Sequence, residues 1–470
     1  MTVTTLKVIP MPKEVIGADT EGNFEYVPFK AVISAASELA PFADSFVQCA
    51  KKLHGIDILQ GEGGIALAVN KLMNKGSYTL TVNGTVNIVA ADTEGINYAL
   101  ATLLQIMTAD GTVPKVSISD YPDCDYRSFM LDIARQWHEF EILLKYVDLC
   151  YLYKVKYFHI HFIDDQSYTL PSKAFPKLST EGRHYTFEQI AELNRYAQAH
   201  GVEIIPEIET PGHSKAVIEA YPELFGCELI EGAEPPKSER IMCVGRPGIM
   251  DTLDTLVDEI VEMFPNSRYL HIGGDEAAIT RWNDCPLCVK YMKDNGIENE
   301  KALYTHFVKL MTNLVLSKGI TPIVWEGFPK EGAEQLSRDI LVVAWESYYH
   351  FANELVEEGF NIVNGSWKPM YITPSIGWTP EEIMKWSVYD WYHFWVKSEA
   401  RLNPIHLPNN HHVKGGIFLS WECTFEQEQP RVKKNLAALS ARTWNVRRYE
   451  DDKLFMGKLE YVLTLADKLI

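Results

Sequence analysis

The chain has 470 residues, of which 46% are hydrophobic and 23% charged, and its formal net charge is −19. This composition is typical of a folded protein with one large or two smaller domains, and it excludes a disordered or fibrous chain. The negative charge and the lack of a basic cluster exclude nucleic acid as an expected partner. No apolar run of about 18 residues predicts a membrane span, and the first 15 residues lack a signal-peptide pattern. Because its eight cysteines are scattered, we expect the chain in the reducing cytoplasm.

Residues 1–118 are expected to form a small α+β domain. Two alternating stretches, 77–82 and 86–90, flank the turn signal Asn83-Gly84 and predict a β-hairpin. Residues 93–108 then carry apolar side chains at helical spacing. A proline-containing stretch at 117–126 predicts the crossing into a second domain, residues 119–470.

The second domain is predicted to be a (β/α)8 TIM barrel. Helical patterns, such as those at 140–153, 187–200 and 249–264, alternate with apolar runs typical of buried parallel strands. We place the eight strands at residues 128–134, 157–163, 202–208, 269–274, 321–325, 340–345, 360–365 and 415–421. A doubly wound sheet is the competing arrangement, but it usually has fewer strands and a glycine-rich phosphate turn after the first one.

Chemically active residues recur where these strands end, which is where catalytic groups lie in this fold. The strand ends carry Asp132 and Arg135, Asp164 and Asp165, Glu207 and Glu209, Asp275 and Glu276, Trp325 and Glu326, Trp345 and Glu346, Trp367 and Tyr371, and Trp421 and Glu422. Tryptophan rings stack on the apolar faces of sugars, and carboxylates accept hydrogen bonds from sugar hydroxyls. The pattern therefore indicates a carbohydrate as the substrate.

The adjacent acids Asp275 and Glu276 suggest how such a substrate is cleaved. Glycosidases usually use two carboxyls about 5 to 9.5 Å apart on opposite sides of the bond. Consecutive residues of a strand point to opposite faces, so these two cannot easily flank one anomeric carbon. If Glu276 protonates the leaving oxygen, Asp275 is placed to orient a 2-acetamido group, whose carbonyl oxygen can act as the nucleophile. Burial and the neighbouring anion are expected to raise the pKa of Glu276, while hydrogen bonds keep Asp275 ionised.

Six motifs, in chain order, strengthen this interpretation: FMLDIAR, HFIDDQ, PEIETPGH, HIGGDE, IVWEG and VVAWES. Together they resemble the glycoside hydrolase family 20 β-N-acetylhexosaminidases, across the whole barrel and in the small leading domain. The resemblance implies an exo-acting, retaining enzyme that removes terminal β-linked N-acetylglucosamine or N-acetylgalactosamine through an oxazolinium intermediate. It implies no cofactor and no metal.

The resemblance also implies roles for individual residues. Glu276 resembles the general acid and base, Asp275 the residue that orients the acetamido group, and Tyr371 the phenol that binds the acetamido oxygen. His213, paired with Glu209, resembles a histidine close to the acid. The residues implied in sugar binding are Arg135, Asp164, His213, Trp325, Trp345, Trp421 and Glu422.

Two positions depart from the family pattern. Thr373 stands where many members have an acidic or amide residue. The last strand ends in Ser420-Trp421-Glu422 where Trp-Gly-Glu is usual, and a shift of one residue along a strand reverses the side that a residue faces. Either a bulge restores Trp421 to the site, or Trp367 supplies the last aromatic wall.

Other interpretations stay open from the sequence alone. One is a non-catalytic sugar-binding barrel, and another is a metal-dependent hydrolase using His159, His161 and Asp164. Cys285 and Cys288 have the spacing of half a zinc site, but no second CxxC or HxxxH lies nearby, so we expect a metal-free loop. Cys227 and Cys243 could supply the missing ligands only if the fold brought them close. The aglycone, the choice between the two amino sugars and the oligomeric state are also open.

Overall fold

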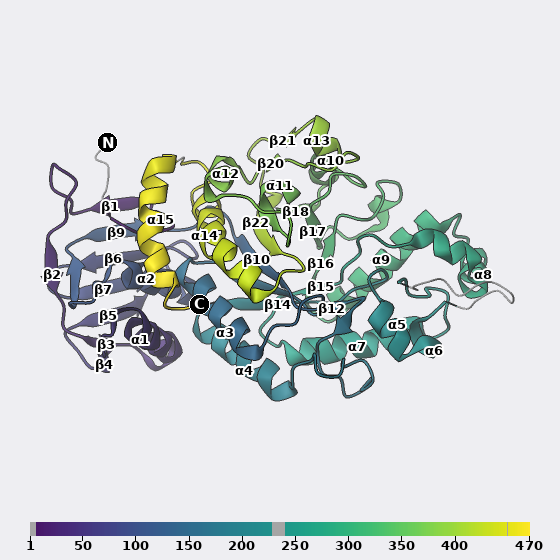
Figure 1. Cartoon of the computed structure of the whole chain (residues 1–470), viewed down its shortest axis with the longest axis horizontal. Helices are drawn as coiled ribbons and strands as arrows, with labels where there is room; N and C mark the ends of the chain where they lie inside the picture. The colour runs from purple at the N-terminus through teal and green to yellow at the C-terminus, as the bar shows by residue number, and fades with distance from the viewer. Residues whose placement is uncertain (1–5, 228–239, 449) are drawn as a thin grey trace.

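The computed structural model describes residues 6–227, 240–448 and 450–470, so the first five residues of the segment searched for a signal peptide lie outside it. Figure 1 shows an elongated molecule with a small sheet domain at the N-terminal end, a barrel in the middle and helix α8 (Pro286–Asp294) at the opposite end. The last helix, α15 (Asp452–Ala466), returns to the N-terminal domain, where Tyr461 donates a hydrogen bond to the carbonyl of Gln105.

The N-terminal domain is built on a mixed sheet with the strand order β1-β9-β6-β7-β5-β3-β4. The bounds are β1 (Glu14–Ile16), β3 (Val32–Ser34), β4 (Leu59–Gln60), β5 (Ile65–Val69), β6 (Tyr78–Val82), β7 (Val86–Ala90) and β9 (Ser117–Asp120), with helices α1 (Ala40–His54) and α2 (Thr93–Ile106). The predicted hairpin is confirmed, because β6 and β7 pair antiparallel. Gly84 turns the chain between them with a φ of 77°, which glycine adopts without strain.

The predicted barrel is confirmed as well. Its eight parallel strands are β10 (Tyr126–Asp132), β11 (Tyr157–His161), β14 (Glu203–Glu207), β15 (Tyr269–His271), β16 (Thr321–Trp325), β17 (Leu341–Ala344), β18 (Asn361–Asn364) and β22 (Val413–Ser420). Parallel pairing of β10 with β22 closes the barrel. Barrel strands are buried on both faces, by helices outside and by side chains inside, which explains why they read as continuous apolar runs.

Helices cover the outside of the barrel in the expected alternation. They include α3 (Phe140–Leu152), α4 (Phe187–Ala199), α7 (Ile249–Met263), α9 (Glu300–Ser317), α10 (Ala352–Glu357) and α14 (Phe425–Trp444). One crossover departs from the pattern, because β16 and β17 are joined through only the short 3-10 helix η3 (Ala333–Gln335). Within the described residues, no helix has both the length and the apolar character needed to cross a membrane.

The change from one sheet to the other falls slightly later than the sequence suggested. The predicted boundary between residues 118 and 119 lies inside β9, which pairs with β1 and β6 of the first sheet. The first barrel strand, β10, begins at Tyr126. We therefore propose that the two domains meet within residues 121–125.

A buried polar cluster joins the two domains. Asp120, at the end of β9, accepts hydrogen bonds from Tyr78 Oη (2.7 Å) and from Trp444 Nε1 (2.9 Å), and it lies 3.2 Å from Lys154 Nζ in an ion pair. Burial lowers the pKa of Lys154 to about 8, although Asp120 opposes the shift. Since a buried charge is costly without its partner, this ion pair fixes the sheet domain against the barrel.

Candidate active site

A cavity of about 220 Å³ opens at the carboxyl ends of the barrel strands. Its lining residues are Arg135, Asp275, Glu276, Trp325, Trp345, Trp367, Tyr371, Thr373, Trp421 and Glu422. Most of these residues were predicted from the sequence for catalysis or sugar binding. The sequence names Trp367 as a strand-end residue and as an alternative to Trp421, and it names Thr373 as a departure from the family pattern. Asp164 and His213 do not line the cavity, but they contact residues that do.

The two adjacent carboxylates lie in a turn just beyond β15. Gly273 has a φ of 72°, and a Cβ at this position would lie 2.1 Å from Glu209 Oε2, so only glycine fits. Glu276 also has a positive φ, of 43°. Because the chain turns here, the alternation of a strand does not apply, and the prediction that Asp275 and Glu276 face opposite sides is corrected. Both line one cavity.

The pKa values of these two acids are shifted in the directions opposite to those predicted. Burial raises the pKa of Asp275 to about 6, and its Oδ1 has no hydrogen-bond partner among the described residues. The side chain of Glu276 is 55% exposed, and its hydrogen bond with His213 lowers its pKa. The physical reason is that solvent and a cationic partner reach Glu276, whereas the carboxylate of Asp275 is shielded.

His213 connects the acid to the barrel interior. Its Nε2 lies 3.3 Å from Glu276 Oε2, and its Nδ1 lies 3.3 Å from Asp164 Oδ1. Although burial favours the neutral imidazole, the hydrogen bonds to Asp164 and Glu276 raise the pKa of His213 to about 10. The predicted pairing with Glu209 is wrong, because Glu209 faces the neighbouring strand, where its Oε1 lies 3.7 Å from His161 Nδ1.

Arg135 is held at the cavity wall by three acids. Its Nη2 lies 2.6 Å from Asp164 Oδ2, its Nη1 lies 3.2 Å from Asp132 Oδ2, and its Nε lies 4.0 Å from Glu422 Oε1. Asp164 is fully buried, so it orients Arg135 and His213 rather than reaching into the cavity. The sequence places Asp132 at the end of the first barrel strand without giving it a role, and the structure shows that it supports Arg135.

Stacked aromatic rings form the rest of the wall. Tyr371 stacks on Trp367 with ring centroids 4.8 Å apart, and on Trp345 at 6.1 Å. The rings of Trp325 and Trp421 lie 5.9 Å apart. Burial and the nearby charge of Asp275 raise the pKa of the Tyr371 phenol well above its ordinary value. Tyr371 therefore keeps its proton and can donate a hydrogen bond.

The end of β22 resolves the shift in register that the sequence raised. The strand ends at Ser420, and Glu422 has a positive φ of 59° while its N–H donates to Asp132 Oδ2. This turn brings both Trp421 and Glu422 to the cavity, and the guanidinium of Arg135 lies 5.0 Å from the centre of the Trp421 ring. Trp367 lines the cavity too, so both candidates for the last wall contribute.

Two acids at the strand ends, Glu326 and Glu207, hold other parts of the site in place. The carboxylate of Glu326 accepts hydrogen bonds from the backbone N–H groups of residues 346–349. The carboxylate of Glu207 accepts one from Trp325 Nε1 at 2.6 Å. Neither acid lines the cavity. They position the loop after β17 and the floor of the aromatic wall, respectively.

The strand histidines proposed as metal ligands belong to a buried ion network. His161 places Nδ1 2.7 Å from Glu207 and Nε2 2.9 Å from Asp164, so both of its nitrogens have partners. The Nε2 of His159 lies 3.0 Å from the same carboxylate of Glu207. Both nitrogens of His161 are thus engaged by carboxylates inside the barrel, as expected if this histidine packs and hydrogen-bonds there.

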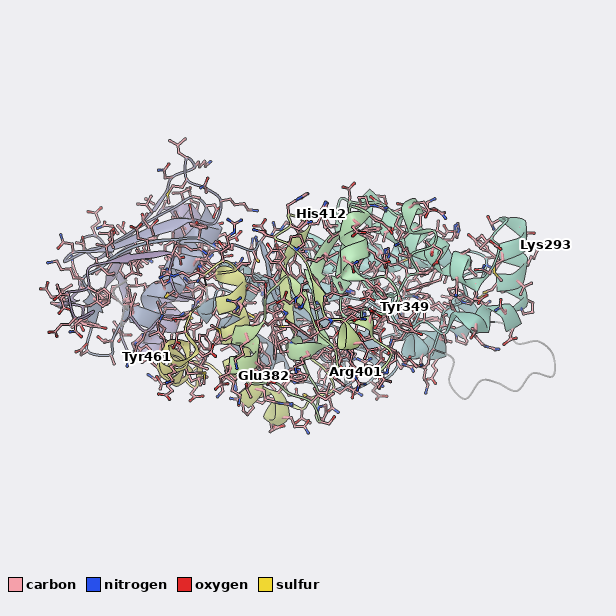
Figure 2. All side chains as sticks on the ribbon, turned by 90° about the horizontal axis from the view of Figure 1, so that it is seen from above. Lys293, Tyr349, Glu382, Arg401, His412 and Tyr461 are labelled. Carbon is pink, nitrogen blue, oxygen red and sulfur yellow. The ribbon has the colours of Figure 1, made fainter. Side chains whose placement is uncertain are left out.

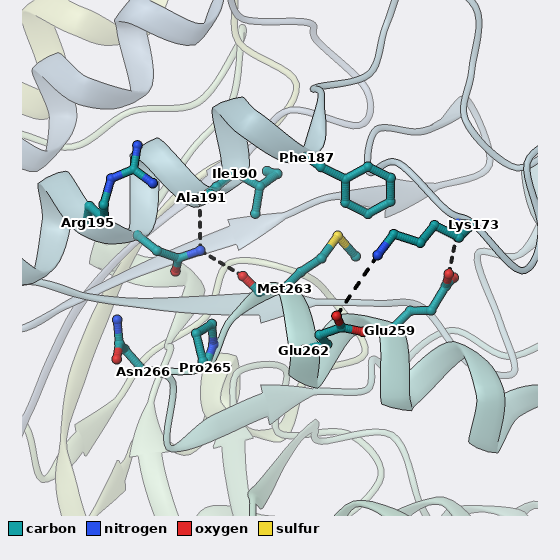
Figure 3. A pocket seen from close by; sticks show the side chains of 11 residues that line it. Lys173, Phe187, Ile190, Ala191, Arg195, Glu259, Glu262, Met263, Pro265 and Asn266 are labelled. Atoms are coloured by element: carbon teal, nitrogen blue, oxygen red, sulfur yellow. Dashed lines mark hydrogen bonds and ion pairs between the residues drawn. The ribbon is translucent and has the colours of Figure 1, made fainter.

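A second hollow, of about 310 Å³, lies between α4 and α7 on the outside of the barrel. Figure 3 shows that Lys173, Glu259 and Glu262 bind one another or the local backbone, while Arg195 and Asn266 make no contact with the other residues drawn. Asn194 donates to two carbonyls, and Glu259 accepts from the backbone N–H groups of Lys173 and Ala174. Because the strand-end cavity gathers acids, an arginine and several aromatic rings, we place the candidate active site there rather than at this hollow.

A closed parallel barrel whose strand ends surround one cavity with acids, an arginine and aromatic rings is typical of glycoside hydrolases. The model of the glycosyl hydrolase family 20 catalytic domain matches residues 124–446, and the model of domain 2 of that family matches residues 5–121. The chain belongs to glycosyl hydrolase family 20.

Curated relatives agree with this membership. The chain is 30% identical over 377 residues to a beta-hexosaminidase of Porphyromonas gingivalis, which covers 72% of this chain and 47% of the relative. It is 29% identical over 350 residues to a beta-hexosaminidase of Vibrio furnissii, and this match covers 68% of this chain and 57% of the relative. The chain thus spans about half the length of these relatives.

Two solved structures share the fold. The exo β-N-acetylglucosaminidase of Vibrio harveyi superposes with a TM-score of 0.84 at 22% identity, covering 100% of this chain and 78% of that one. The β-N-acetylhexosaminidase of Bacteroides fragilis superposes with a TM-score of 0.79 at 22% identity. The superposition covers 98% of this chain and 96% of that one.

Proposed function

We propose that this chain is a β-N-acetylhexosaminidase, which removes a terminal β-linked N-acetylglucosamine or N-acetylgalactosamine with the acetamido oxygen of the substrate as nucleophile. One observation carries the proposal: Asp275 and Glu276 reach the same cavity from a single turn. Among the described residues, one further carboxylate lines this cavity, that of Glu422, and it lies near Arg135. The names of the curated relatives and the N-acetylglucosamine bound in the Vibrio harveyi structure support the same substrate.

Binding uses the charged and aromatic parts of the wall in different ways. Arg135 donates to sugar hydroxyls, and Glu422 accepts from them. Trp421 presents a ring face next to Arg135 and stacks on the apolar face of the sugar. The acetamido group enters between Trp325, Trp345 and Tyr371, where the tyrosine O–H donates to its carbonyl oxygen.

In the first chemical step, Glu276 protonates the glycosidic oxygen while the acetamido oxygen attacks the anomeric carbon. The bond to the leaving group breaks, and an oxazolinium ion forms. Asp275 accepts the amide N–H and stabilises the positive charge that develops there. In the second step, Glu276 removes a proton from water, which attacks the anomeric carbon and opens the ring. Two displacements at the same carbon retain its configuration.

The mechanism needs a high pKa at Glu276, which must carry a proton, and a low pKa at Asp275, which must be ionised. Substrate binding shifts both pKa values in these directions. A sugar over Glu276 excludes water from this exposed side chain, which raises its pKa and favours the protonated acid. The acetamido N–H binds Asp275 and lowers its pKa, because a hydrogen bond to the charged form stabilises that form. The shielded Oδ1 of Asp275, which has no partner among the described residues, is the acceptor we assign to this bond.

The first experiment compares hydrolysis of an aryl β-N-acetylglucosaminide with that of the matching β-glucoside. We expect strong preference for the acetamido substrate and tight inhibition by a thiazoline that mimics the bicyclic intermediate, since transition-state-like ligands bind more tightly than substrates. Equal rates with no inhibition would contradict the proposal and indicate a carboxylate nucleophile. Sugar binding without any turnover would support a non-catalytic sugar-binding barrel instead.

The pH dependence tests the pair of acids, because the mechanism needs one proton shared between Asp275 and Glu276. In the free protein the higher pKa of the pair is about 6, on Asp275, and the lower one belongs to Glu276. Above about pH 6 the pair holds no proton, and in the acid range it holds two. Only the state with one proton is active. We therefore expect a bell-shaped kcat/KM for an alkyl glycoside, with a fall of about tenfold per pH unit well above pH 6.

Initial rates between about pH 4 and pH 9 provide the measurement. An aryl glycoside with a good leaving group is the control, because it needs no proton from the protein and should keep its rate above pH 6. An alkyl-glycoside profile that stays level up to pH 8 would refute the assignment of the proton to this pair.

A further inference from the structure

Four buried cysteines meet at the end of the barrel domain that lies farthest from the N-terminal sheet. Cys227 follows the short helix α6 (Pro222–Phe225), and Cys243 lies in the segment leading to α7. Cys285 and Cys288 enclose the start of α8. Figure 2 marks this end of the molecule with Lys293, on α8. The sequence predicted a metal-free loop at Cys285 and Cys288, because the partners that could complete a site are distant along the chain.

The sulfur atoms have the spacing of ligands around one ion. All four Sγ atoms lie within 4.8 Å of one another. Cys243 Sγ lies 3.6 Å from Cys285 Sγ and 3.6 Å from Cys288 Sγ. A Zn–S distance of about 2.3 Å in a tetrahedral site sets neighbouring sulfur atoms about 3.8 Å apart. A disulfide would hold two of them about 2.05 Å apart. The observed distances therefore match a tetrahedral metal site and not a disulfide.

The surroundings of the cluster keep the segments close enough for shared coordination. A Cβ on Gly245 would lie 2.2 Å from the carbonyl oxygen of Leu287, so glycine lets the Cys243 segment approach the start of α8. Trp282 Nε1 donates to the carbonyl of Met242 at 2.9 Å, and the N–H of Cys243 donates to the carbonyl of Phe225 at 2.7 Å. These bonds hold the Cys243 segment against Phe225 on one side and Trp282 on the other.

We propose that Cys227, Cys243, Cys285 and Cys288 form a structural Zn²⁺ site. Four thiolates in a closed tetrahedral set are the ligands of structural rather than catalytic zinc. The ion would join the described residues 214–227, which follow His213 and form the short helices α5 (Lys215–Ala220) and α6, to residues 277–288, which follow Glu276 and include a short 3-10 helix. It would act as a cross-link where the local secondary structure is too short to hold the two active-site loops together.

Metal analysis of the purified full chain, prepared under reducing conditions, tests the site. We expect about one zinc per chain after gel filtration. Titrating the wild-type thiols with an organomercurial should release the zinc to a colorimetric chelator and lower Tm by about 5 °C or more. This measurement does not depend on the folding of any variant. Hydrogen exchange should then accelerate in residues 240–246 and 277–288.

Variants locate the ligands. Cys243→Ser should lose at least about nine tenths of the zinc, because its sulfur is central to the cluster. Cys150→Ser is the matched control, since Cys150 is equally buried but lies on α3, and it should keep the full complement. A wild-type chain that binds no zinc after reconstitution, one that holds iron in its place, or a Cys243→Ser chain that retains its zinc would each overturn the proposal.

Discussion

Glu276→Gln is expected to lower kcat/KM for glycosides with poor leaving groups by about 10²- to 10⁴-fold, which is the usual cost of removing a general acid. Glutamine keeps the shape of the side chain but has no proton to give to the departing oxygen. Aryl glycosides with activated leaving groups need little protonation, so their first step should be slowed much less. Comparing kcat/KM for an alkyl and an activated aryl N-acetylglucosaminide measures the difference.

Glu262→Gln is a suitable control for this substitution. Glu262 is an exposed acid on α7 that lies beside the outer hollow rather than the active-site cavity, so its loss should leave both rates unchanged. An equal loss on both substrates with Glu276→Gln would argue against the role of Glu276 as the acid. It would instead indicate a general disturbance of the turn after β15.

Asp275→Asn is expected to lower kcat for the aryl N-acetylglucosaminide by about 10²- to 10³-fold, comparable with removing one preorganised electrostatic contact. Asparagine fills the same space, but it carries no negative charge to stabilise the oxazolinium ion. The thiazoline inhibitor should lose affinity, because it resembles that ion. Steady-state kinetics and the inhibition constant provide the two measurements.

The control for this change is Asp57→Asn, which removes an exposed carboxylate in the N-terminal domain. It should alter neither kcat nor inhibition. A rate for Asp275→Asn close to that of the unaltered chain would mean that the acetamido group is not the nucleophile.

Because the zinc proposal is tested by metal content and Tm, its outcome is separate from that of the Asp275→Asn experiment.

The barrel was readable from the sequence because each of its strands is buried on both faces. That environment favours a run of apolar residues, as in 340–345, and most of the crossovers to the next strand form a helix. The hairpin at Asn83-Gly84 was equally local, since the turn itself requires a left-handed residue. Such features depend on neighbours in the chain, so their pattern is visible before folding.

The membership of the candidate site was also largely readable, because catalytic groups of a barrel gather at strand ends. The sequence did not show how those groups pair. It joined His213 to Glu209, whereas Asp164 and Glu276 are the carboxylates beside the imidazole, and it reversed the pKa shifts of Asp275 and Glu276. Which acid is shielded from water and which meets a cation depends on groups from several strands.

The sequence by itself therefore determined the barrel, the small leading domain and the set of acids and aromatic residues at the strand ends. Only the tertiary structure decided that Glu422 and Trp421 share the cavity, through a positive φ that no strand pattern encodes. It alone brought Cys227 and Cys243 to Cys285 and Cys288. The physical reason is the separation along the chain over which each effect acts. Periodicity and turn chemistry depend on residues a few positions apart. Metal coordination and the shielding of a carboxylate from water depend on segments that meet only when the chain folds.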